Sequence, residues 1–336
     1  MTDSNTIRWG ILGAARVNER FIPAVLASPS GKLVAMASRR PGAALDLLHK
    51  FGGDQGIQIH SGLSELIQNP DVDAIYIPLS NHEHAEWALK AIEAGKHVLC
   101  EKPLAIRVED IERIESAANK KGVQVLEGFM YRFHPQHQRV RSIIESGLIG
   151  DIRYVRSSFS FMMRPQRLYR LEESIENGGG ALWDIGCYAV HAARLWFDTP
   201  PLAVSAQSTW VESGADLSTS GILDFGQGQR ALFDFAFDCS RRSEYEITGT
   251  LGSIKCKTVW QLPGDIPVIE WKLDDGRAAT ETLRPSNHFE LEIEAFSQAI
   301  LGGSSLPCSL EDARINCKTL LATVTAAKTG QTTLIA

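Results

Sequence analysis

The sequence predicts an α/β protein: a doubly wound parallel sheet, followed by a second, α+β domain with a large, open and mostly antiparallel sheet. Two patterns in the 336-residue chain predict this fold. Up to about residue 126, short apolar segments alternate with amphipathic ones, as in parallel strands joined by helices. From about residue 127, long stretches alternate apolar and polar residues, as in an antiparallel sheet with one buried face. We therefore expect two domains in direct contact, residues 1–126 and 127–336.

In the first domain the apolar segments predict strands at residues 7–12, 32–37, 57–60, 74–78, 97–100 and 123–126. The amphipathic segments predict helices at residues 16–27, 43–51, 64–68, 83–94 and 108–120. In the fourth of these helices Ala85, Ala88 and Ile92 fall on one face. Because ligands of open α/β sheets bind at the carboxyl ends of the strands, the residues that follow each strand are the candidates for a site.

In the second domain the alternating segments predict strands at residues 152–161, 203–212, 220–225, 230–237, 244–248, 254–259 and 268–273. Helices are expected at residues 135–146, 181–196, 289–301 and 310–328. In the strand at 230–237, Ala231, Phe233 and Phe235 share one face, whereas Leu232 and Asp234 share the other. This alternation predicts a sheet that is covered by helices on one side only.

The composition is that of a soluble globular protein, with 44% hydrophobic and 22% charged residues. A net charge of −6 argues against nucleic acid and anionic membranes as partners, because both bind basic surfaces. The six cysteines form no C-x-x-C pair, so free thiols are expected. We see no signal peptide and no apolar segment of the roughly 18 residues that a membrane span needs. The expected location is the cytoplasm.

The turn after the first predicted strand is a degenerate G-x-G-x-x-G phosphate-binding sequence. Gly13 makes the turn, but Ala15 stands where a glycine usually lets the backbone approach a pyrophosphate. The alternative is a strand-to-helix turn with a purely structural role. In the strand–turn–helix context, the turn predicts a dinucleotide site. Its expected cofactor-binding residues are Gly13, Ala14, Ala15, Arg16 and Val17.

The end of the second predicted strand indicates which dinucleotide is bound. Sites for NAD usually place Asp or Glu there, to hold the ribose 2′-hydroxyl. This chain has Ser38, Arg39 and Arg40 instead, and guanidinium groups bind a 2′-phosphate. We therefore predict NADP rather than NAD; the alternative is a pair of solvated arginines on a surface loop.

The fifth predicted strand ends in Glu101, Lys102 and Pro103, which places a lysine at the ligand-binding edge of the sheet. A second group of reactive types lies in the helix expected at 181–196, where Asp184, Tyr188 and His191 would share one face. A nearby ammonium group lowers the pKa of a phenol, so Lys102 could make Tyr188 a usable acid/base. We expect the two side chains to meet over a bound nicotinamide. The alternative for Tyr188 is a core tyrosine with a satisfied hydroxyl.

Other residues are weaker candidates. His82, Glu83 and His84 lack the H-E-x-x-H spacing, so no metal site is predicted, and His84 is expected to line the cofactor cleft instead. The polar and aromatic segments near Arg132 and Tyr169 could border a sugar pocket or could be ordinary loop anchors. The cleft residues expected after the fourth and fifth strands are Leu79, Asn81, His84, Glu101 and Lys102. The residues expected to bind substrate are Asp184, Arg132, Tyr169 and Arg170.

In four segments the chain resembles the Gfo/Idh/MocA oxidoreductases. They are residues 9–16, residues 77–84, residues 94–104 with the Glu-Lys-Pro, and residues 178–188. The resemblance covers nearly the whole chain. It implies an N-terminal Rossmann domain and a C-terminal domain whose open sheet is commonly an oligomer interface. In the family's D-x-G-x-H motif, Tyr188 here replaces the histidine. That form is similar to the branch with glucose–fructose oxidoreductase, NADP-dependent xylose dehydrogenase and dimeric dihydrodiol dehydrogenase.

The resemblance implies that Tyr188 is the general acid/base, that Lys102 is its electrostatic partner and that Asp184 binds a substrate hydroxyl. The expected function is NADP(H)-dependent hydride transfer to or from a carbinol or carbonyl carbon of a sugar, a related cyclic polyol or a ketosugar. Two alternatives are oxidation of trans-dihydrodiols and a non-catalytic NADP-sensing regulatory protein. The expected partner is a small carbohydrate-like molecule, and the expected assembly is a homodimer or homotetramer. The substrate and the direction of reaction stay open.

Overall fold

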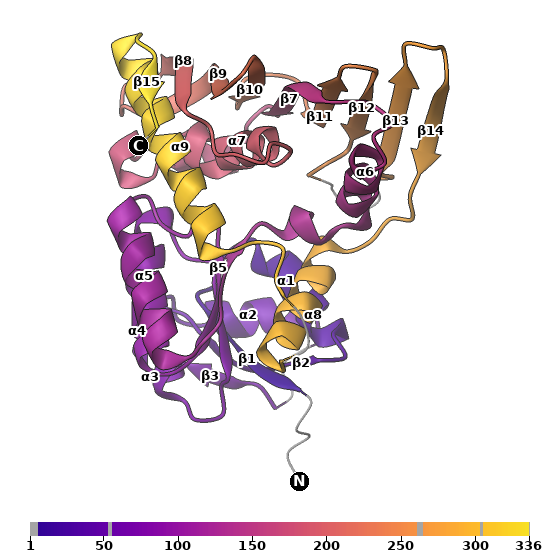
Figure 1. Ribbon diagram of the computed structural model, residues 1–336. Helices are drawn as coiled ribbons and strands as arrows, with labels where there is room; N and C mark the ends of the chain where they lie inside the picture. The colour runs from indigo at the N-terminus through magenta and orange to yellow at the C-terminus, as the bar shows by residue number, and fades with distance from the viewer. Residues whose placement is uncertain (1–5, 53–55, 261–264, 303–304, 336) are drawn as a thin grey trace. The chain divides into compact units, whose positions relative to one another are not determined.

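A computed structural model describes residues 6–52, 56–260, 265–302 and 305–335 (Figure 1). These residues form two compact units. The first comprises Met1–Phe133 and Asn287–Arg314, and the second comprises His134–Ser286 and Ile315–Ala336. The sequence-based division at 126/127 assigned Asn287–Arg314 to the second domain, whereas in the structure this segment packs with the first.

The first unit contains a six-stranded parallel sheet in the order β3-β2-β1-β4-β5-β6. Its strands are β1 (Ile7–Leu12), β2 (Gly31–Ala37), β3 (Gln58–His60), β4 (Ala74–Ile77), β5 (His97–Glu101) and β6 (Val125–Gly128). Strands β2 and β3 lie on one side of the central β1/β4 pair, and β5 and β6 lie on the other. This is the strand order of a dinucleotide-binding fold. The predicted strands are confirmed, with ends shifted by one or two residues.

The helices between these strands also agree with the prediction. They are α1 (Asn18–Ala27), α2 (Ala43–His49), α3 (Leu63–Gln68), α4 (His84–Glu93) and α5 (Val108–Lys121). Two short 3₁₀ segments, η1 (Asn81–Glu83) and η2 (Met130–Phe133), follow β4 and β6. The helix expected at 83–94 therefore starts as 3₁₀ and becomes α-helical at His84.

Helix α8 (His288–Ile300) belongs to the first unit because its apolar face completes that unit's core. Phe296 of α8 lies 5.7 Å from Trp9 of β1, measured between ring centroids. Trp9 in turn lies 5.7 Å from Phe21 of α1, which stacks on Tyr76 of β4 at 3.6 Å. These aromatic contacts join segments that are nearly 300 residues apart in sequence, and this separation is why local patterns did not reveal the assignment.

The second unit contains a nine-stranded sheet in the order β14-β13-β12-β11-β7-β10-β9-β8-β15. Its strands are β7 (Ile152–Ser160), β8 (Ala203–Trp210), β9 (Asp216–Gly226), β10 (Gln229–Ala236), β11 (Arg242–Gly249), β12 (Gly252–Lys257), β13 (Val268–Leu273), β14 (Ala278–Thr282) and β15 (Thr333–Leu334). All neighbouring pairs are antiparallel except β7 and β10. The mostly antiparallel sheet is thus confirmed. The short edge strands β14 and β15 were not predicted, because five and two residues carry too little alternation to stand out.

Helices α6 (Pro135–Glu145) and α7 (Cys187–Arg194) lie in the second unit, and α9 (Leu310–Thr329) includes the point at which the chain passes from the first unit to the second. Two 3₁₀ segments, η3 (Pro165–Leu171) and η4 (Ile175–Asn177), precede a π-helical turn, η5 (Leu182–Gly186). The single α-helix predicted at 181–196 is therefore wrong in its first part, which is wound as a π-helix.

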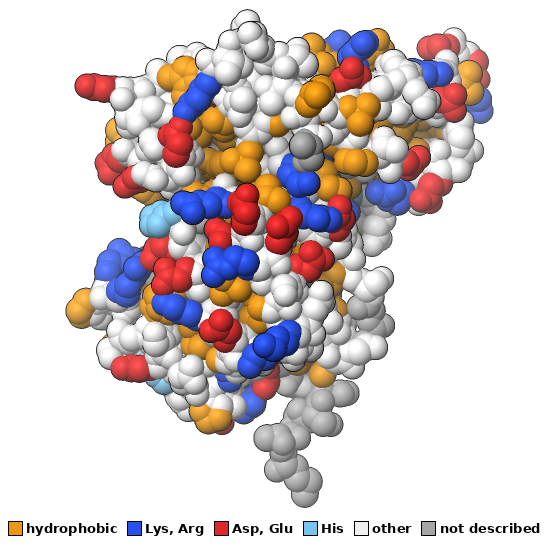
Figure 2. All heavy atoms as spheres, turned by 60° about the vertical axis from the view of Figure 1, so that its left-hand side comes forward, with side chains coloured by type: hydrophobic (Ala, Val, Ile, Leu, Met, Phe, Trp, Pro, Cys, Tyr) orange, Lys and Arg blue, Asp and Glu red, His pale blue; other side chains and the backbone are white. Residues whose placement is uncertain are grey.

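Acidic and basic side chains are intermingled on the face drawn in Figure 2. The six cysteines are free thiols, and all except Cys239 are buried. Within the described ranges, no helix combines the length and the apolar character that crossing a membrane requires.

Candidate active site

The turn after β1 has the backbone geometry that the degenerate glycine motif predicts. Gly13 has a φ of +122°, a conformation that L side chains rarely adopt, and a Cβ there would lie 2.7 Å from Leu79 Cδ2. Asn18 is fully buried, and its Nδ2 donates a hydrogen bond to the Gly13 carbonyl at 2.7 Å. Asn18 stands where the motif has its third glycine, so a side-chain hydrogen bond supports the turn at that position.

The residues after β2 are fixed by contacts to neighbouring loops. The Ser38 hydroxyl accepts a hydrogen bond from the Arg40 backbone N–H at 3.1 Å, and the Arg40 guanidinium donates to the Ala14 carbonyl. Arg39 forms a two-point ion pair with Glu83, Nη1 to Oε1 at 2.7 Å and Nη2 to Oε2 at 3.0 Å. Both arginines lie at the surface, as in the alternative of two solvated arginines, and each is held by a contact to another loop.

The ion pair determines the charge state of Glu83. Burial disfavours ionisation of its carboxyl group, but the hydrogen bonds and positive charge of Arg39 outweigh burial and hold the pKa of Glu83 below its usual value. Glu83 is therefore an anion at neutral pH. The sequence alone gave no sign of this contact, because Glu83 follows β4 and Arg39 follows β2.

The end of β5 is held from two sides. Glu101 Oε1 accepts a hydrogen bond from the Tyr76 hydroxyl at 2.6 Å. Lys102 is 8% exposed and is joined to Pro103 by a cis peptide bond. The buried ring of His84 has Nδ1 2.7 Å from the Pro103 carbonyl oxygen and Nε2 3.0 Å from that of Leu79. His84, expected to line the cofactor cleft, thus ties together the loops after β4 and β5.

The contacts of residues 82–84 do not support a metal site. Glu83 is paired with Arg39, and the ring nitrogens of His84 are directed at backbone carbonyls. Among the residues that the structure describes, no group of three or more His, Cys, Asp and Glu side chains is arranged to hold a metal ion.

In the second unit a buried aspartate organises the segment that carries Asp184 and Tyr188. Both oxygens of Asp216 accept a hydrogen bond from the Leu182 N–H at 3.1 Å, and the Thr219 hydroxyl donates to Oδ2 at 2.9 Å. Gly180 has a φ of +95°, and a Cβ there would lie 2.2 Å from Asp216 Oδ1. Burial raises the pKa of Asp216 to about 6, although the hydrogen bonds from Leu182 and Thr219 oppose that shift. Sequence reasoning missed Asp216.

The π-helical turn changes how Asp184 and Tyr188 are related. Gly186 lies against the sheet, since a Cβ there would fall 2.6 Å from Phe235 Cζ. The i, i+4 relation expected from a regular α-helix does not hold across η5, because a π turn takes one residue more. Such turns occur frequently at functional sites. The sequence pattern predicts a regular helix over 181–196 and does not reveal the π turn.

Asp184 is 5% exposed and is paired with two arginines of η3. Arg167 Nη2 lies 2.5 Å from Asp184 Oδ2, and Arg170 Nη2 lies 3.8 Å from Oδ1. Residues three apart are eclipsed in a 3₁₀ helix, which is why both guanidinium groups reach one carboxylate. Arg170 was predicted as a site residue and Arg167 was not. The spacing of Arg164, Arg167 and Arg170 was the available signal.

Tyr188 is 8% exposed and lies in an aromatic cluster. Its ring is 5.8 Å from Phe159 and 6.2 Å from Trp260, both edge-on, and Phe159 stacks on Trp260 at 4.5 Å. Phe161 continues this cluster to Arg167, whose guanidinium carbon lies 5.0 Å from the Phe161 ring centroid. Arg167, Asp184 and Tyr188 are therefore connected to one aromatic surface within the second unit.

Arg132 and Tyr169, which were also predicted to bind substrate, lie outside this aromatic cluster in the contacts described. Arg132 donates a hydrogen bond to the Pro307 carbonyl at 2.9 Å and lies 3.8 Å from Asp312, so its guanidinium holds the segment before α9. Tyr169 is 52% exposed on η3. His191 is fully buried in α7.

Comparison with protein families agrees with this architecture. Residues 7–129 match the oxidoreductase family with an NAD-binding Rossmann fold, and residues 137–255 match the GFO/IDH/MocA C-terminal domain. The chain belongs to the GFO/IDH/MocA oxidoreductase family. The predicted family, fold and enzyme class are confirmed.

Three relatives are similar over almost their whole length. The uncharacterized oxidoreductase ORF334 of Rhizobium meliloti is 38% identical, with 91% of this chain and 92% of the relative covered. The dTDP-3,4-didehydro-2,6-dideoxy-alpha-D-glucose 3-reductase of Actinomadura kijaniata is 35% identical over 90% of each chain. The NADP-dependent D-xylose 1-dehydrogenase 2 of Haloferax volcanii is 32% identical over 96% of this chain and 98% of the relative.

The fold is also that of a solved structure. KijD10, a 3-ketoreductase from Actinomadura kijaniata crystallised with NADP and TDP-benzene, superposes with a TM-score of 0.87 at 33% identity. The superposition covers 96% of this chain and 98% of KijD10.

Proposed function

We propose that the protein is an NADP(H)-dependent oxidoreductase that moves hydride between the nicotinamide and a carbinol or carbonyl carbon of a sugar, related cyclic polyol or ketosugar. The observation that carries the cofactor choice is the carboxyl edge of β2, where Ser38, Arg39 and Arg40 stand and no carboxylate follows directly. The relatives crystallised with NADP or named for it support the same choice.

The first unit fits a dinucleotide on its own geometry. The strand order reverses direction at the central β1/β4 pair. The turn that follows β1 has a positive φ at Gly13. Helix α1 begins five residues later, with its N-terminal N–H groups at the same edge of the sheet. That end of a helix favours anions such as a pyrophosphate. Gly13 to Val17 would hold the pyrophosphate, and Ser38, Arg39 and Arg40 would hold the 2′-phosphate. When bound, the cofactor supplies a hydride donor or acceptor.

The proposed proton transfer belongs to Tyr188 and Lys102. When a carbinol carbon loses hydride, its hydroxyl must lose a proton, and the Tyr188 phenol accepts it; in reduction the phenol donates it. A free phenol has a pKa near 10, which is too high for a good base at neutral pH. The Lys102 ammonium would favour the phenolate and stabilise the developing alkoxide. Lys102 and Tyr188 belong to different units, so this step requires both to face one bound substrate.

The arginines of η3 favour a second candidate substrate within this class. Arg164 at the N-cap of η3, and Arg167 and Arg170 within it, stand three residues apart, and Arg167 and Arg170 pair with the Asp184 carboxylate. Guanidinium groups bind phosphate oxygens. KijD10 was crystallised with TDP-benzene, so a ketosugar attached to a nucleoside diphosphate is the second candidate.

An absorbance screen at the reduced-nicotinamide band tests the function. NADP is combined with aldoses, polyols and trans-dihydrodiols, and NADPH with ketosugars and nucleoside-diphosphate ketosugars. Turnover of a carbohydrate is the expected result. Preferred turnover of a trans-dihydrodiol would replace the sugar substrate. Binding of NADPH without turnover of any compound would favour a regulatory NADP sensor.

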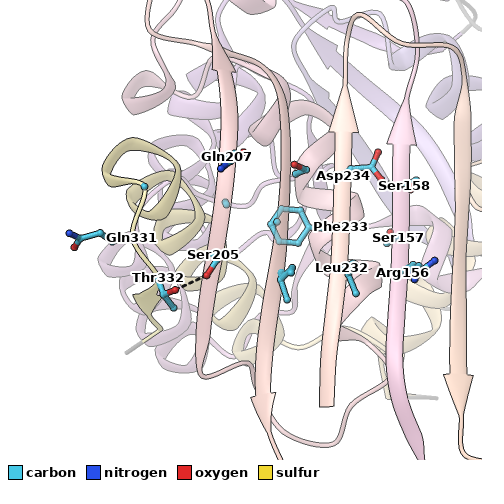
Figure 3. A pocket seen from close by; sticks show the side chains of 15 residues that line it. Arg156, Ser157, Ser158, Ser205, Gln207, Leu232, Phe233, Asp234, Gln331 and Thr332 are labelled. Carbon is cyan, nitrogen blue, oxygen red and sulfur yellow. Dashed lines mark hydrogen bonds between the residues drawn. The ribbon is translucent and has the colours of Figure 1, made fainter. Parts of the chain in front are cut away.

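A homodimer or homotetramer formed through the open sheet face is part of the same proposal. Figure 3 shows a hollow on β7 to β10 and residues 330–332, and Ser205 is hydrogen-bonded to Thr332 at 2.7 Å. Cross-strand neighbours Leu232 and Ile222 lie in it, and Ile222 is 43% exposed. An apolar strip on a sheet face with a polar border fits a second copy. Light scattering of wild type and Ile222→Glu tests it: the substitution should lower the mass to that of a smaller assembly.

A further inference from the structure

Arg39 and Glu83 form an ion pair across the carboxyl edge of the parallel sheet. Arg39 follows β2, Glu83 lies in η1 after β4, and β1 lies between β2 and β4 in the strand order. The pair therefore joins two loops on either side of the Gly13 turn. Both carboxylate oxygens and both terminal guanidinium nitrogens take part, at 2.7 and 3.0 Å.

The two partners differ in exposure. The Arg39 side chain is 59% exposed, whereas that of Glu83 is only 14% exposed. The arginine is thus the partner that can turn toward a ligand, and the carboxylate is the partner fixed in the protein. A phosphate bound to Arg39 in the same two-point manner would use the nitrogens that Glu83 now occupies, because carboxylate and phosphate present equivalent oxygen pairs to a guanidinium fork.

We infer that Glu83 is a specificity-determining residue whose carboxylate competes with the 2′-phosphate of NADP for Arg39. The inference rests on the proposed function. Binding NADP exchanges one anion at Arg39 for another, so the Arg39–Glu83 contact is lost as the Arg39–phosphate contact forms. NAD has no 2′-phosphate, and its binding does not require this exchange. Glu83 thereby weakens NADP binding selectively and helps the cofactor to leave.

The size of the effect follows from the exposure of the pair. Exposed ion pairs change an equilibrium by a factor of about two to five. Repulsion between Glu83 and a nearby phosphate acts in the same direction. Replacing Glu83 with its uncharged isostere should therefore tighten NADPH binding by about two- to fivefold.

The experiment measures dissociation constants of NADPH and NADH by fluorescence titration of the full-length protein. Glu83→Gln should lower the Kd of NADPH by about two- to fivefold and leave that of NADH unchanged. The matched control is Glu86→Gln, which removes the same charge three residues away on α4, where Glu86 pairs with Lys90. This control should change neither constant. Thermal unfolding verifies that both variants are folded.

Combining Glu83→Gln with Arg39→Ala separates competition for Arg39 from a general electrostatic effect of the Glu83 charge. In Arg39→Ala the guanidinium is absent and only the repulsion between Glu83 and the phosphate remains, so adding Glu83→Gln should lower the Kd of NADPH by less than it does in the wild type. An equal tightening in that background would overturn the inference, as would an unchanged Kd for NADPH in Glu83→Gln alone. Weaker NADPH binding would also overturn it, since Glu83 would then hold Arg39 in place for the phosphate. A wild type that prefers NADH would instead contradict the proposed cofactor itself.

Discussion

Arg167 and Asp184 approach within 2.5 Å, and this contact ties the exposed 3₁₀ segment η3 to the buried π turn η5. Asp184 was expected to bind a substrate hydroxyl directly. In the structure its carboxylate is engaged by Arg167, with Arg170 at 3.8 Å. Asp184 therefore orients two arginines, of which Arg167 lies beside the same aromatic cluster as Tyr188.

Replacing Arg167 with methionine should destabilise the protein. The change removes the 2.5 Å contact of Arg167 with the buried Asp184 carboxylate, and weaker pairing of a buried charge costs about 1–3 kcal/mol. Urea unfolding measures this loss. Arg164→Met, three residues earlier at the exposed N-cap of η3, should change the free energy of unfolding by less than about 0.5 kcal/mol. Equal stability of the two variants would contradict the importance of the contact.

Lys102→Ala and Tyr188→Phe should each lower kcat by about 10²- to 10⁴-fold, because each removes part of the proposed acid/base pair. The Kd of NADPH should change only modestly. Single-turnover kinetics with NADPH and the best substrate from the screen measure both quantities. Lys90→Ala and Tyr154→Phe alter exposed residues of the same types and should retain activity. Near-normal kcat in both site variants would exclude this mechanism.

Arg39→Ala should reduce the preference for NADP. Hydrogen bonds to charged groups contribute about 1.5–3 kcal/mol, so the ratio of kcat/KM for NADP to that for NAD should fall by about 10- to 100-fold. Steady-state kinetics with both cofactors give the ratio. Arg113→Ala, on the exposed side of α5, is the matched control. A ratio that stays constant would show that Arg39 does not contact the 2′-phosphate.

The contribution of Asp216 to the free energy of unfolding should decline as the pH rises. Its pKa is about 6 in the folded protein and 3.8 in the unfolded reference, so the folded state holds the extra proton between these values. The contribution of Asp216 is present below about pH 4 and is lost by about pH 6, a change of about 3 kcal/mol. Comparing the unfolding free energies of wild type and Asp216→Asn from pH 4 to 7 isolates it. A difference independent of pH would contradict the raised pKa.

Glu292 of α8 should destabilise the folded state at high pH. It is fully buried, neither of its oxygens has a partner among the described residues, and burial, reinforced by the negative charge of Glu101, raises its pKa well above 4.5. A raised pKa means that stability is lost as the pH increases. Glu292→Gln should therefore raise Tm more at pH 8 than at pH 5. A larger gain at pH 5 would contradict this assignment.

Local sequence determined the strands and helices of the first unit and the residues at their ends. Each βα segment carries its own hydrophobic period and its own turn, and the carboxyl ends of parallel strands meet at one edge whatever else the chain does. Gly13, Ser38, Arg39 and Lys102 could therefore be placed at that edge from the sequence. The alternating strands of the second unit were predictable for the same reason.

Tertiary structure alone decided the contacts between distant segments. Trp9 and Phe296 assign α8 to the first unit, Glu83 is brought to Arg39 across β1, and Asp216 is placed on the Leu182 N–H. Gly186, at the end of the π turn, likewise lies against Phe235 of a distant strand. None of these contacts leaves a local period or a fixed spacing, because burial and ion pairing depend on where the chain returns rather than on which residues are neighbours in sequence.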